Sequence, residues 1–206
     1  MDLRIACIVE GHGELEAVPI VVRRIAQAID PRLAIQLGHP LRIPKSRLVK
    51  PGELERAVEI AARRVGIAGG ILIILDSDDE CPARLGPELL VRAKKVRSDL
   101  PIRVVLAKRE FEAWFLAAAE SLQGKRGLAQ DLTCPSDPES IRGAKEWLTG
   151  HMVEGQRYVE TLDQSALASV FDLADARRAP SFDKFYRDVI GLLQHFSQLG
   201  TTLQMV

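Results

Sequence analysis

The sequence predicts an α/β fold, in which a mainly parallel sheet has helices on both faces and is followed by a C-terminal helical extension. Short aliphatic segments at 3–9, 71–75 and 102–106 alternate with longer segments whose apolar residues recur at helical spacing. Strands that alternate with helices are typical of a parallel sheet covered on both sides. The aliphatic residues at 71–75 show no polar alternation, which indicates a central strand buried on both faces.

The elements expected in the first part of the chain follow from these patterns. They are strands at 3–9, 33–37, 71–75 and 102–106, helices at 14–28, 51–65, 82–97 and 111–122, and a basic loop at 40–51. In the first helix Val18, Val22 and Ile25 share one face. This helix should end at Asp30-Pro31, because the residue before a proline disfavours the α conformation.

The character of the chain changes after residue 122. Residues 123–140 are rich in Gly, Pro, Ser and Asp without a clear period, which predicts a long loop. Helical segments are expected at 139–148, 164–175 and 181–199, with Ser181 as the N-cap of the last one. We therefore expect an α/β domain at 1–122 and a loop and helical extension at 123–206 packed on it.

Composition indicates a globular protein with a local basic segment. Hydrophobic residues make up 47% of the chain and aromatic residues only 5%, so the core should be mostly aliphatic. The 28 basic and 28 acidic side chains cancel, which excludes a strongly basic nucleic-acid binder. Residues 82–126 nevertheless hold 10 basic and 5 acidic side chains, a net charge of +5. Arginine supplies 20 of the 28 cations, and arginine suits bidentate contact with phosphate.

Cysteine usage and hydropathy favour the cytoplasm. None of the three cysteines lies in a CxxC pair, which favours free thiols in a reducing compartment. The first apolar segment stops at Glu10, so no signal peptide is expected. The longest apolar segment, at 66–75, is far short of the ~20 residues that span a bilayer, so no membrane association is expected.

Acidic residues follow two of the expected strands. Glu10 follows the first strand, and Asp76 and Asp78 follow the strand at 71–75. If these strands are neighbours, the three carboxylates meet at the carboxyl edge of the sheet, where open α/β sheets bind ligands. Crowded carboxylates need a cation or a proton, and oxygen ligands suit Mg²⁺ or Mn²⁺. The alternative is that these acids only cap the next helix or lie in a solvated loop.

Further charged residues follow the strand at 102–106. Lys108 or Arg109 is placed to contact phosphate, and Glu110 or Glu112 is placed to join the carboxylates. Glu112 also stands in the first turn of an expected helix, where the helix dipole favours an acid without any further role. A dinucleotide site at Gly11 and Gly13 is rejected, because the acids around them would repel a pyrophosphate.

Three sequence elements resemble the Toprim family, which includes topoisomerases, bacterial primases and OLD-type nucleases. They are Val9-Glu10-Gly11 with Glu14 after it, Asp76-Ser77-Asp78, and Glu110-Phe111-Glu112-Ala113-Trp114-Phe115-Leu116-Ala117. Their order is similar to that in small stand-alone Toprim-like proteins related to the OLD nucleases. The resemblance implies a Toprim-like, Rossmann-like fold, with Glu10 as a metal ligand or general acid/base and Asp76 and Asp78 holding Mg²⁺. Glu14 would match the second glutamate of the OLD-like version, and Glu112 a later acid.

The resemblance implies a Mg²⁺-dependent phosphodiester-cleaving enzyme, nuclease-like, in DNA repair or phage defence. Glu10, Lys108 and Arg109 would be its catalytic residues, acting on the backbone of DNA or RNA. OLD nucleases carry an ATPase module in the same chain, which is not found in this sequence, so a separate ATPase subunit is an expected partner. The main alternative is a non-catalytic subunit of a defence complex that binds nucleic acid or a partner. A nucleotide-sugar enzyme that uses the Asp-x-Asp element is a weaker one.

Overall fold

The structure is a computed structural model that describes residues 3–203, without the side chains of residue 68 and residues 196–203. Its strands are β1 (Leu3–Val9), β2 (Ile35–Leu37), β3 (Leu41–Arg42), β4 (Gly69–Asp76) and β5 (Ile102–Ala107). Its α-helices are α1 (Glu14–Ile29), α2 (Lys45–Leu48), α3 (Glu53–Val65), α4 (Pro82–Val96), α5 (Ala113–Ala117), α6 (Ala144–Gly150), α7 (Glu160–Ala168), α8 (Leu173–Ala176) and α9 (Pro180–Leu203). Short 3₁₀ helices are η1 (Gly66–Ala68), η2 (Ala119–Leu122), η3 (Lys125–Gly127) and η4 (Pro138–Ser140).

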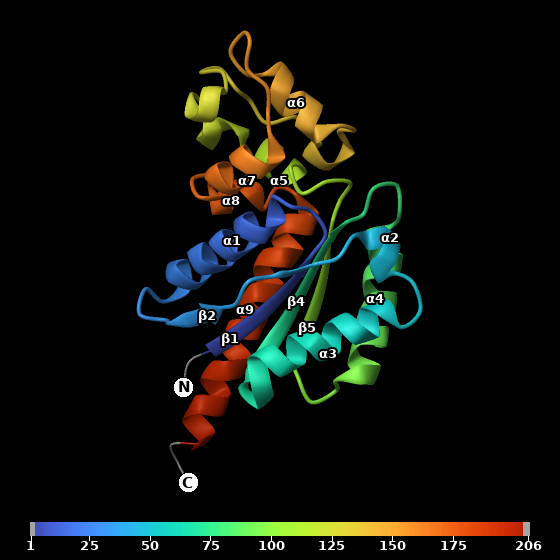
Figure 1. The fold of residues 1–206 in the computed structure, drawn as a ribbon. Helices are drawn as coiled ribbons and strands as arrows, with labels where there is room; N and C mark the ends of the chain where they lie inside the picture. The colour runs from blue at the N-terminus through green and yellow to red at the C-terminus, as the bar shows by residue number, and fades with distance from the viewer. Residues whose placement is uncertain (1–2, 204–206) are drawn as a thin grey trace.

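The strands form one parallel sheet in the order β2-β1-β4-β5, with β3 pairing the end of β1 beyond β2. Figure 1 shows α1 and α9 on one face of this sheet and α3 and α4 on the other. The α/β fold predicted from the sequence, a mainly parallel sheet between helical layers, is therefore confirmed. No helix in the described part of the chain has the length and apolarity needed to cross a membrane.

The central strand β4 is buried on both faces, as its unbroken aliphatic sequence predicts. Leu72 and Ile74 belong to the hydrophobic cluster under α1 and α9, whereas Ile71, Ile73 and Leu75 belong to the cluster under α3 and α4. All five side chains are buried. Successive side chains of a strand point to opposite faces, so a strand covered on both sides must be apolar at every position.

The two clusters differ in composition. The cluster under α3 and α4 is aliphatic, as expected, but the cluster under α1 and α9 contains aromatic rings in tilted and edge-to-face contact. The indole of Trp114 lies 5.1 Å from the ring of Phe182 and 5.0 Å from that of Phe185, measured between ring centroids. These contacts join the sheet half of the chain to α9, so the larger core combines residues from both sides of residue 122.

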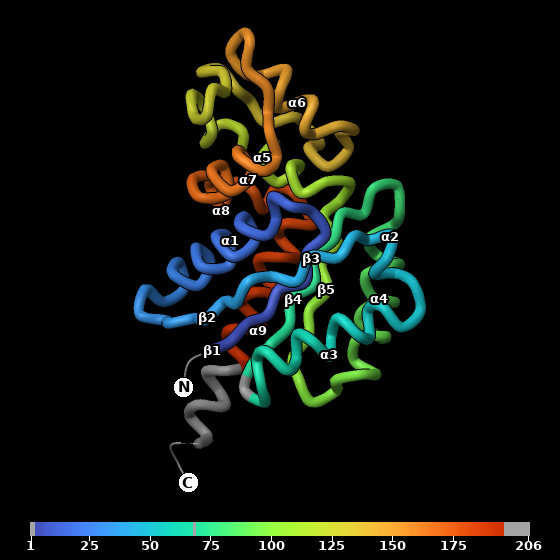
Figure 2. Tube along the Cα trace, viewed as in Figure 1, coloured from blue at the N-terminus to red at the C-terminus, as the bar shows by residue number. Residues whose placement is uncertain are grey.

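The chain between α5 and α9 lies beyond the carboxyl ends of the strands (Figure 1; Figure 2). Helix α9 then returns along the sheet and packs against α1 and β5. The extension therefore does two things: its first part covers the edge where β1 and β4 end, and its last helix completes a layer of the sheet. The division at residue 122 stays a prediction.

Several expected elements have other bounds in the structure. The expected loop at 40–51 contains β3 and α2, and the expected helix at 111–122 is split into α5 and η2. The expected helix at 139–148 is split into η4 and α6 by Gly143, whose φ of 72° is left-handed and cannot continue a helix. The expected helix at 164–175 is interrupted at residues 169–172, between α7 and α8. Helix α9 begins at Pro180, so Ser181 lies inside the helix and is not its N-cap.

Candidate active site at the carboxyl edge of the sheet

Glu10 and Asp76 meet at the carboxyl edge because β1 and β4 are paired neighbours. One carboxylate oxygen of Glu10 accepts a hydrogen bond of 3.3 Å from the backbone N–H of Asp76. Its other oxygen accepts one of 3.2 Å from the backbone N–H of Lys45, the first residue of α2. The structure therefore brings together the first two acids that the strand ends predict, and it fixes Glu10 to two chain segments.

Glu14 is buried beneath the loop that joins β1 to α1. Its Oε2 accepts hydrogen bonds from the backbone N–H groups of Glu10 (2.8 Å) and Gly11 (3.1 Å), so the carboxylate holds the turn that leads from β1 into α1. The turn packs closely against α7, since a Cβ added at Gly13 would lie 2.1 Å from Gln164 Oε1. Glycine is required at this point by the close approach of α7.

Asp76 and Glu112 extend the group of acids toward the loop after β5. Asp76 Oδ1 accepts a 2.8 Å hydrogen bond from the backbone N–H of Phe111, which ties the end of β4 to this loop. Glu112 is completely buried at the start of α5, and its Oε1 accepts hydrogen bonds from Tyr158 Oη (2.9 Å) and Gln164 Nε2 (3.2 Å). Its Oε2 is buried without a hydrogen-bond partner.

These buried acids disfavour one another's charged forms. Burial raises the pKa of Asp76 well above its ordinary value, and the charges of Glu14, Glu112 and Glu10 raise it further. Burial also raises the pKa of Glu14 to about 7, although two backbone hydrogen bonds oppose the shift. The pKa of Glu112 is likewise raised by burial to about 7, against the attraction of Lys145. Glu10, Glu14, Asp76 and Glu112 are called the carboxylate group below.

Lys145, near the start of α6, is a counter-ion to this group that the strand-end pattern did not reveal. Its Nζ lies 3.9 Å from Glu112 Oε1 and 2.7 Å from Glu160 Oε2. Burial lowers the pKa of Lys145, but the negative charges of Glu112, Glu160 and Asp76 outweigh this and raise it. Lys145, Tyr158 and Gln164 belong to the extension and follow no strand, so no positional signal marked them in the sequence.

Asp78 does not join the buried carboxylates. It lies in the turn after β4 with a left-handed φ of 49°, its side chain is 64% exposed, and its carboxylate pairs with Lys45 Nζ. Lys45 Nζ also lies 3.4 Å from a carboxylate oxygen of Glu80, and the charge of Glu10 helps to raise its pKa against the effect of burial. The ammonium group of Lys45 therefore lies among three acids, where a metal ion was expected from the sequence.

Lys108 and Arg109 separate at the end of β5. Lys108 donates its backbone N–H to Ser181 Oγ at 3.1 Å, and its charge lowers the pKa of Glu139, which burial raises. Arg109 has a left-handed φ of 64° and places Nη1 3.2 Å from Asp79 Oδ1. Arg109 thus reaches the turn after β4, whereas Lys108 faces the extension.

The donor chemistry of the carboxylate group fits a hard divalent cation, but its ligands are not preassembled. Within residues 3–203 no group of three or more His, Cys, Asp or Glu side chains is arranged to hold a metal ion. Two buried oxygens, Glu112 Oε2 and Gln164 Oε1, nevertheless have no partner, and carboxylate and amide oxygens are the ligands that Mg²⁺ prefers. Glu10, Asp76 and Glu112 would hold such an ion, with Glu14 behind them and Asp78 joining when it leaves Lys45.

Comparison with known proteins identifies a family but gives no function for it. The domain of unknown function DUF4276 matches residues 9–190, which run from the last residue of β1 through the rest of the sheet and into α9. No curated protein and no solved structure matches the chain.

Proposed function

The chain belongs to the DUF4276 family of domains of unknown function, and from the geometry of its carboxylate group we propose that it is a Mg²⁺- or Mn²⁺-dependent phosphodiester-cleaving enzyme, nuclease-like, that acts on DNA or RNA. The proposal rests on one observation: four acids gather at the carboxyl edge of a parallel sheet, and three of them are buried or almost buried. Such a group costs electrostatic energy in the absence of a cation, and a bound cation would relieve this cost.

Each side chain has a specific part in the proposed chemistry. A divalent cation at this edge would polarise the phosphoryl group and make water a better nucleophile near neutral pH. Glu10, held by two backbone N–H groups, would keep a fixed position as a ligand or as general acid/base. Arg109 would contact the phosphate beside it, as a guanidinium is suited to do. Lys108 faces the extension, so its proposed catalytic part requires its side chain to turn toward the edge.

Cleavage of nucleic acid by the purified chain tests the proposal. We expect single-stranded or duplex DNA or RNA to be cut with Mg²⁺ or Mn²⁺ and not with a chelator. Asp76→Asn should abolish cleavage, since it removes a charge but still accepts the hydrogen bond from Phe111. Asp131→Asn, at an exposed position away from the carboxylate group, is the matched control and should cut as the wild type does. Equal cleavage by Asp76→Asn would contradict the proposal.

The second candidate is a subunit that binds nucleic acid or a partner without cutting. It is favoured by the pairing of Lys45 with Asp78 and Glu80, which neutralises acids that a metal would need. Binding of nucleic acid without cleavage under every metal condition would support this candidate. Cleavage that appears only after a separate ATPase subunit is added would instead support the enzyme and its proposed partner.

A further inference from the structure

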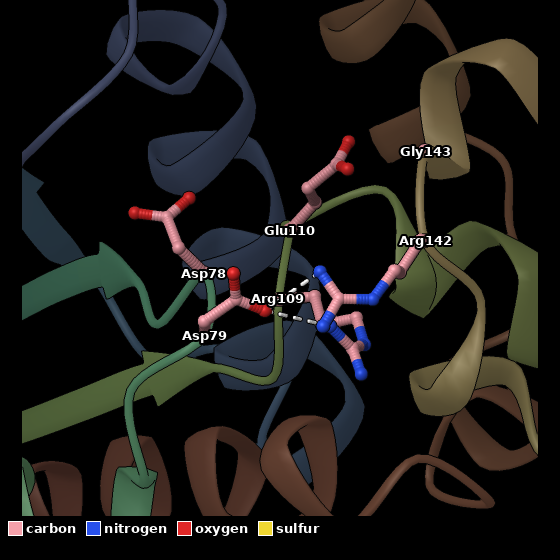
Figure 3. Close-up of a pocket in the computed structure, with 6 residues that line it drawn as sticks. All are labelled: Asp78, Asp79, Arg109, Glu110, Arg142 and Gly143. Carbon is pink, nitrogen blue, oxygen red and sulfur yellow. Dashed lines mark hydrogen bonds and ion pairs between the residues drawn. The ribbon is translucent and has the colours of Figure 1, made fainter.

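A polar pocket of about 170 Å³ lies beside the carboxylate group. It is lined by Asp78, Asp79, Arg109, Glu110, Arg142 and Gly143 (Figure 3). Its two arginines come from distant parts of the sequence, since Arg109 follows β5 and Arg142 precedes α6 in the extension. The covering segment of the extension therefore supplies a second cation to this edge.

The two guanidinium groups converge on one oxygen atom. Nη1 of Arg109 lies 3.2 Å from Asp79 Oδ1, and Nη1 of Arg142 lies 2.7 Å from the same oxygen (Figure 3). Two cations therefore share a single carboxylate, whose side chain is 71% exposed. In addition, Arg109 Nε is buried and has no hydrogen-bond partner. The pair of arginines thus has more donor capacity than Asp79 satisfies.

The backbone fixes Arg109 in its position at some cost. Asp78 and Arg109 both have left-handed φ angles, of 49° and 64°, which residues other than glycine adopt rarely. Two hydrogen bonds hold this arrangement, from Arg109 N–H to Ser77 Oγ (2.8 Å) and from Asp78 N–H to the Arg109 carbonyl (3.0 Å). Strained conformations of this kind concentrate at ligand-binding sites.

We propose that Arg109 and Arg142 form a binding subsite for a phosphate group, and that the Asp79 carboxylate occupies it in the ligand-free protein. A phosphate group presents several oxygens to two guanidinium groups, including one for the unpartnered Nε of Arg109. The identity of the ligand rests on the proposed function: the phosphate would be a backbone phosphate or a terminal phosphate of a nucleic acid. It adds Arg142, in the extension, to the residues that position the substrate.

The other acids of the pocket compete less than Asp79 does for the guanidinium groups of Arg109 and Arg142. Figure 3 shows the side chain of Glu110 pointing away from the two guanidinium groups, and Asp78 is paired with Lys45. Asp79 lies in the exposed turn between β4 and α4, so its side chain can move into solvent when a phosphate arrives. Its departure leaves both arginines free for the phosphate.

Binding of inorganic phosphate to the metal-free protein, measured by calorimetry at constant ionic strength with a chelator, tests the subsite. We expect Asp79→Asn to lower the Kd for phosphate about tenfold, because the competing charge is gone. Arg142→Ala, at a position 70% exposed, should fold normally and lose this binding. The control is Asp183→Asn in α9, since Asp183 also pairs with two exposed arginines, Arg177 and Arg187. This control frees the same positive charge outside the pocket and should bind phosphate as the wild type does.

The outcomes separate the subsite from the proposed function. Equal gains in Asp79→Asn and Asp183→Asn, or unchanged binding in Arg142→Ala, would overturn the subsite, because surplus charge alone would then explain the result. Phosphate binding that behaves as expected in a protein that cuts no nucleic acid would retain the subsite and reject the enzyme. Dinucleotides with and without a 5′-phosphate then distinguish the source, because a terminal phosphate binds only in the first and a backbone phosphate in both.

Discussion

Lys45 places an ammonium group where three acids approach the carboxyl edge of the sheet. It pairs with Asp78 and Glu80, and Glu10 helps to hold its charge. A divalent cation that used Asp78 and Glu10 would have to displace this ammonium group or bind beside it, and two cations a few Å apart repel each other. In the proposed enzyme, Lys45 therefore opposes the binding of metal.

We expect Lys45→Gln to bind Mg²⁺ or Mn²⁺ about tenfold more tightly than the wild type, because the competing charge is removed. The same variant should melt at a lower temperature without metal, since it leaves three acids with less compensation. Calorimetric titration and thermal melting measure the two effects. Lys50→Gln, an exposed position nearby, removes the same charge without these contacts and should change neither. Equal effects in both variants would show that only net charge matters.

Glu112 gives a second prediction, which concerns pH. Its pKa is raised by burial to about 7, so the folded protein binds a proton that the unfolded chain releases near pH 4.5. The free energy of unfolding that this group contributes is therefore fully present below about pH 4.5, is lost as pH rises from about 4.5 to about 7, and stays reduced above that. Glu112→Gln resembles the protonated carboxyl group and keeps an acceptor for Tyr158. In the presence of a chelator, it should match the wild type at about pH 4 and exceed it by about 1–3 kcal/mol at pH 8.5.

Urea denaturation at the two pH values checks this expectation, with the exposed Glu154→Gln as the control that should show no difference. A variant that is less stable than the wild type at pH 8.5 would show instead that the charge pair with Lys145 outweighs the cost of burial.

The strand-end argument placed some site residues and missed others for a physical reason. Glu10 and Asp76 follow strands that proved to be neighbours, so the sequence could place them together. Asp78, two residues further, lies in the turn after β4 and pairs with Lys45, which no strand pattern reveals. Arg142 and Lys145 come from the segment expected as a helix at 139–148, and its position over the carboxyl edge depends on tertiary packing, so they could not be assigned to the site from the sequence.

At the scale of elements, Ser181 joins three segments behind the site. Its Oγ accepts hydrogen bonds from the backbone N–H of Lys108 (3.1 Å) and from Trp114 Nε1 (2.8 Å). Its own backbone N–H donates to Glu139 at 2.8 Å. One buried hydroxyl thus connects the end of β5, the helix α5 and the first turn of α9. The sequence singled out Ser181 as a helix cap, but the side chain bonds to other elements instead.

Removal of this hydroxyl should be costly. Ser181→Ala leaves one buried and one partly buried N–H donor without an acceptor, and we expect the free energy of unfolding to fall by about 2 kcal/mol. Urea denaturation measures this change. Ser169→Ala, which removes an exposed hydroxyl bonded only to the carbonyl of Ala166, should cost less than about 0.5 kcal/mol. Similar small losses in both variants would mean that water or a local shift replaces the contacts of Ser181.

The long periodic elements were predictable, whereas the short ones were not. The helices α1, α3 and α4 and the strands β1, β4 and β5 carry an apolar pattern long enough to identify each of them. By contrast, α5 is five residues long and buried on every side, so packing rather than periodicity decides where it ends. The strand β3, of two residues, exists because it pairs with the end of β1.

At the scale of the whole molecule, the basic segment at 82–126 does not form one surface. Helix α4 runs back from the carboxyl edge, so the cations in its last turn, Lys94 and Lys95, lie toward the opposite end of the sheet. Arg92 pairs with Glu55 of α3, and Arg97 pairs with Asp99. This segment has a net charge of +5, but only some of its cations lie where they can contact a nucleic acid at the site.

The salt dependence of nucleic-acid binding should reflect this distribution. Each phosphate contact releases condensed counterions and contributes about −0.9 to the slope of log K against log salt for duplex DNA. With Arg109 and Arg142 as the main contacts, we expect weak binding with a slope of about −2, measured by fluorescence anisotropy at constant Mg²⁺.

Single arginine variants then test which cations contact the backbone. Arg109→Ala and Arg142→Ala should each reduce the steepness of the slope by about one and weaken binding to all sequences alike, because contacts with the backbone carry no sequence information. Arg97→Ala, which removes an arginine paired at the far end of the sheet, should leave the slope unchanged. A slope near −5 that Arg97→Ala reduces would show that α4 contacts the nucleic acid and that the binding surface extends along this helix. Undetectable binding at low salt would instead make a small phosphate ester the better substrate for the carboxylate group and its two arginines.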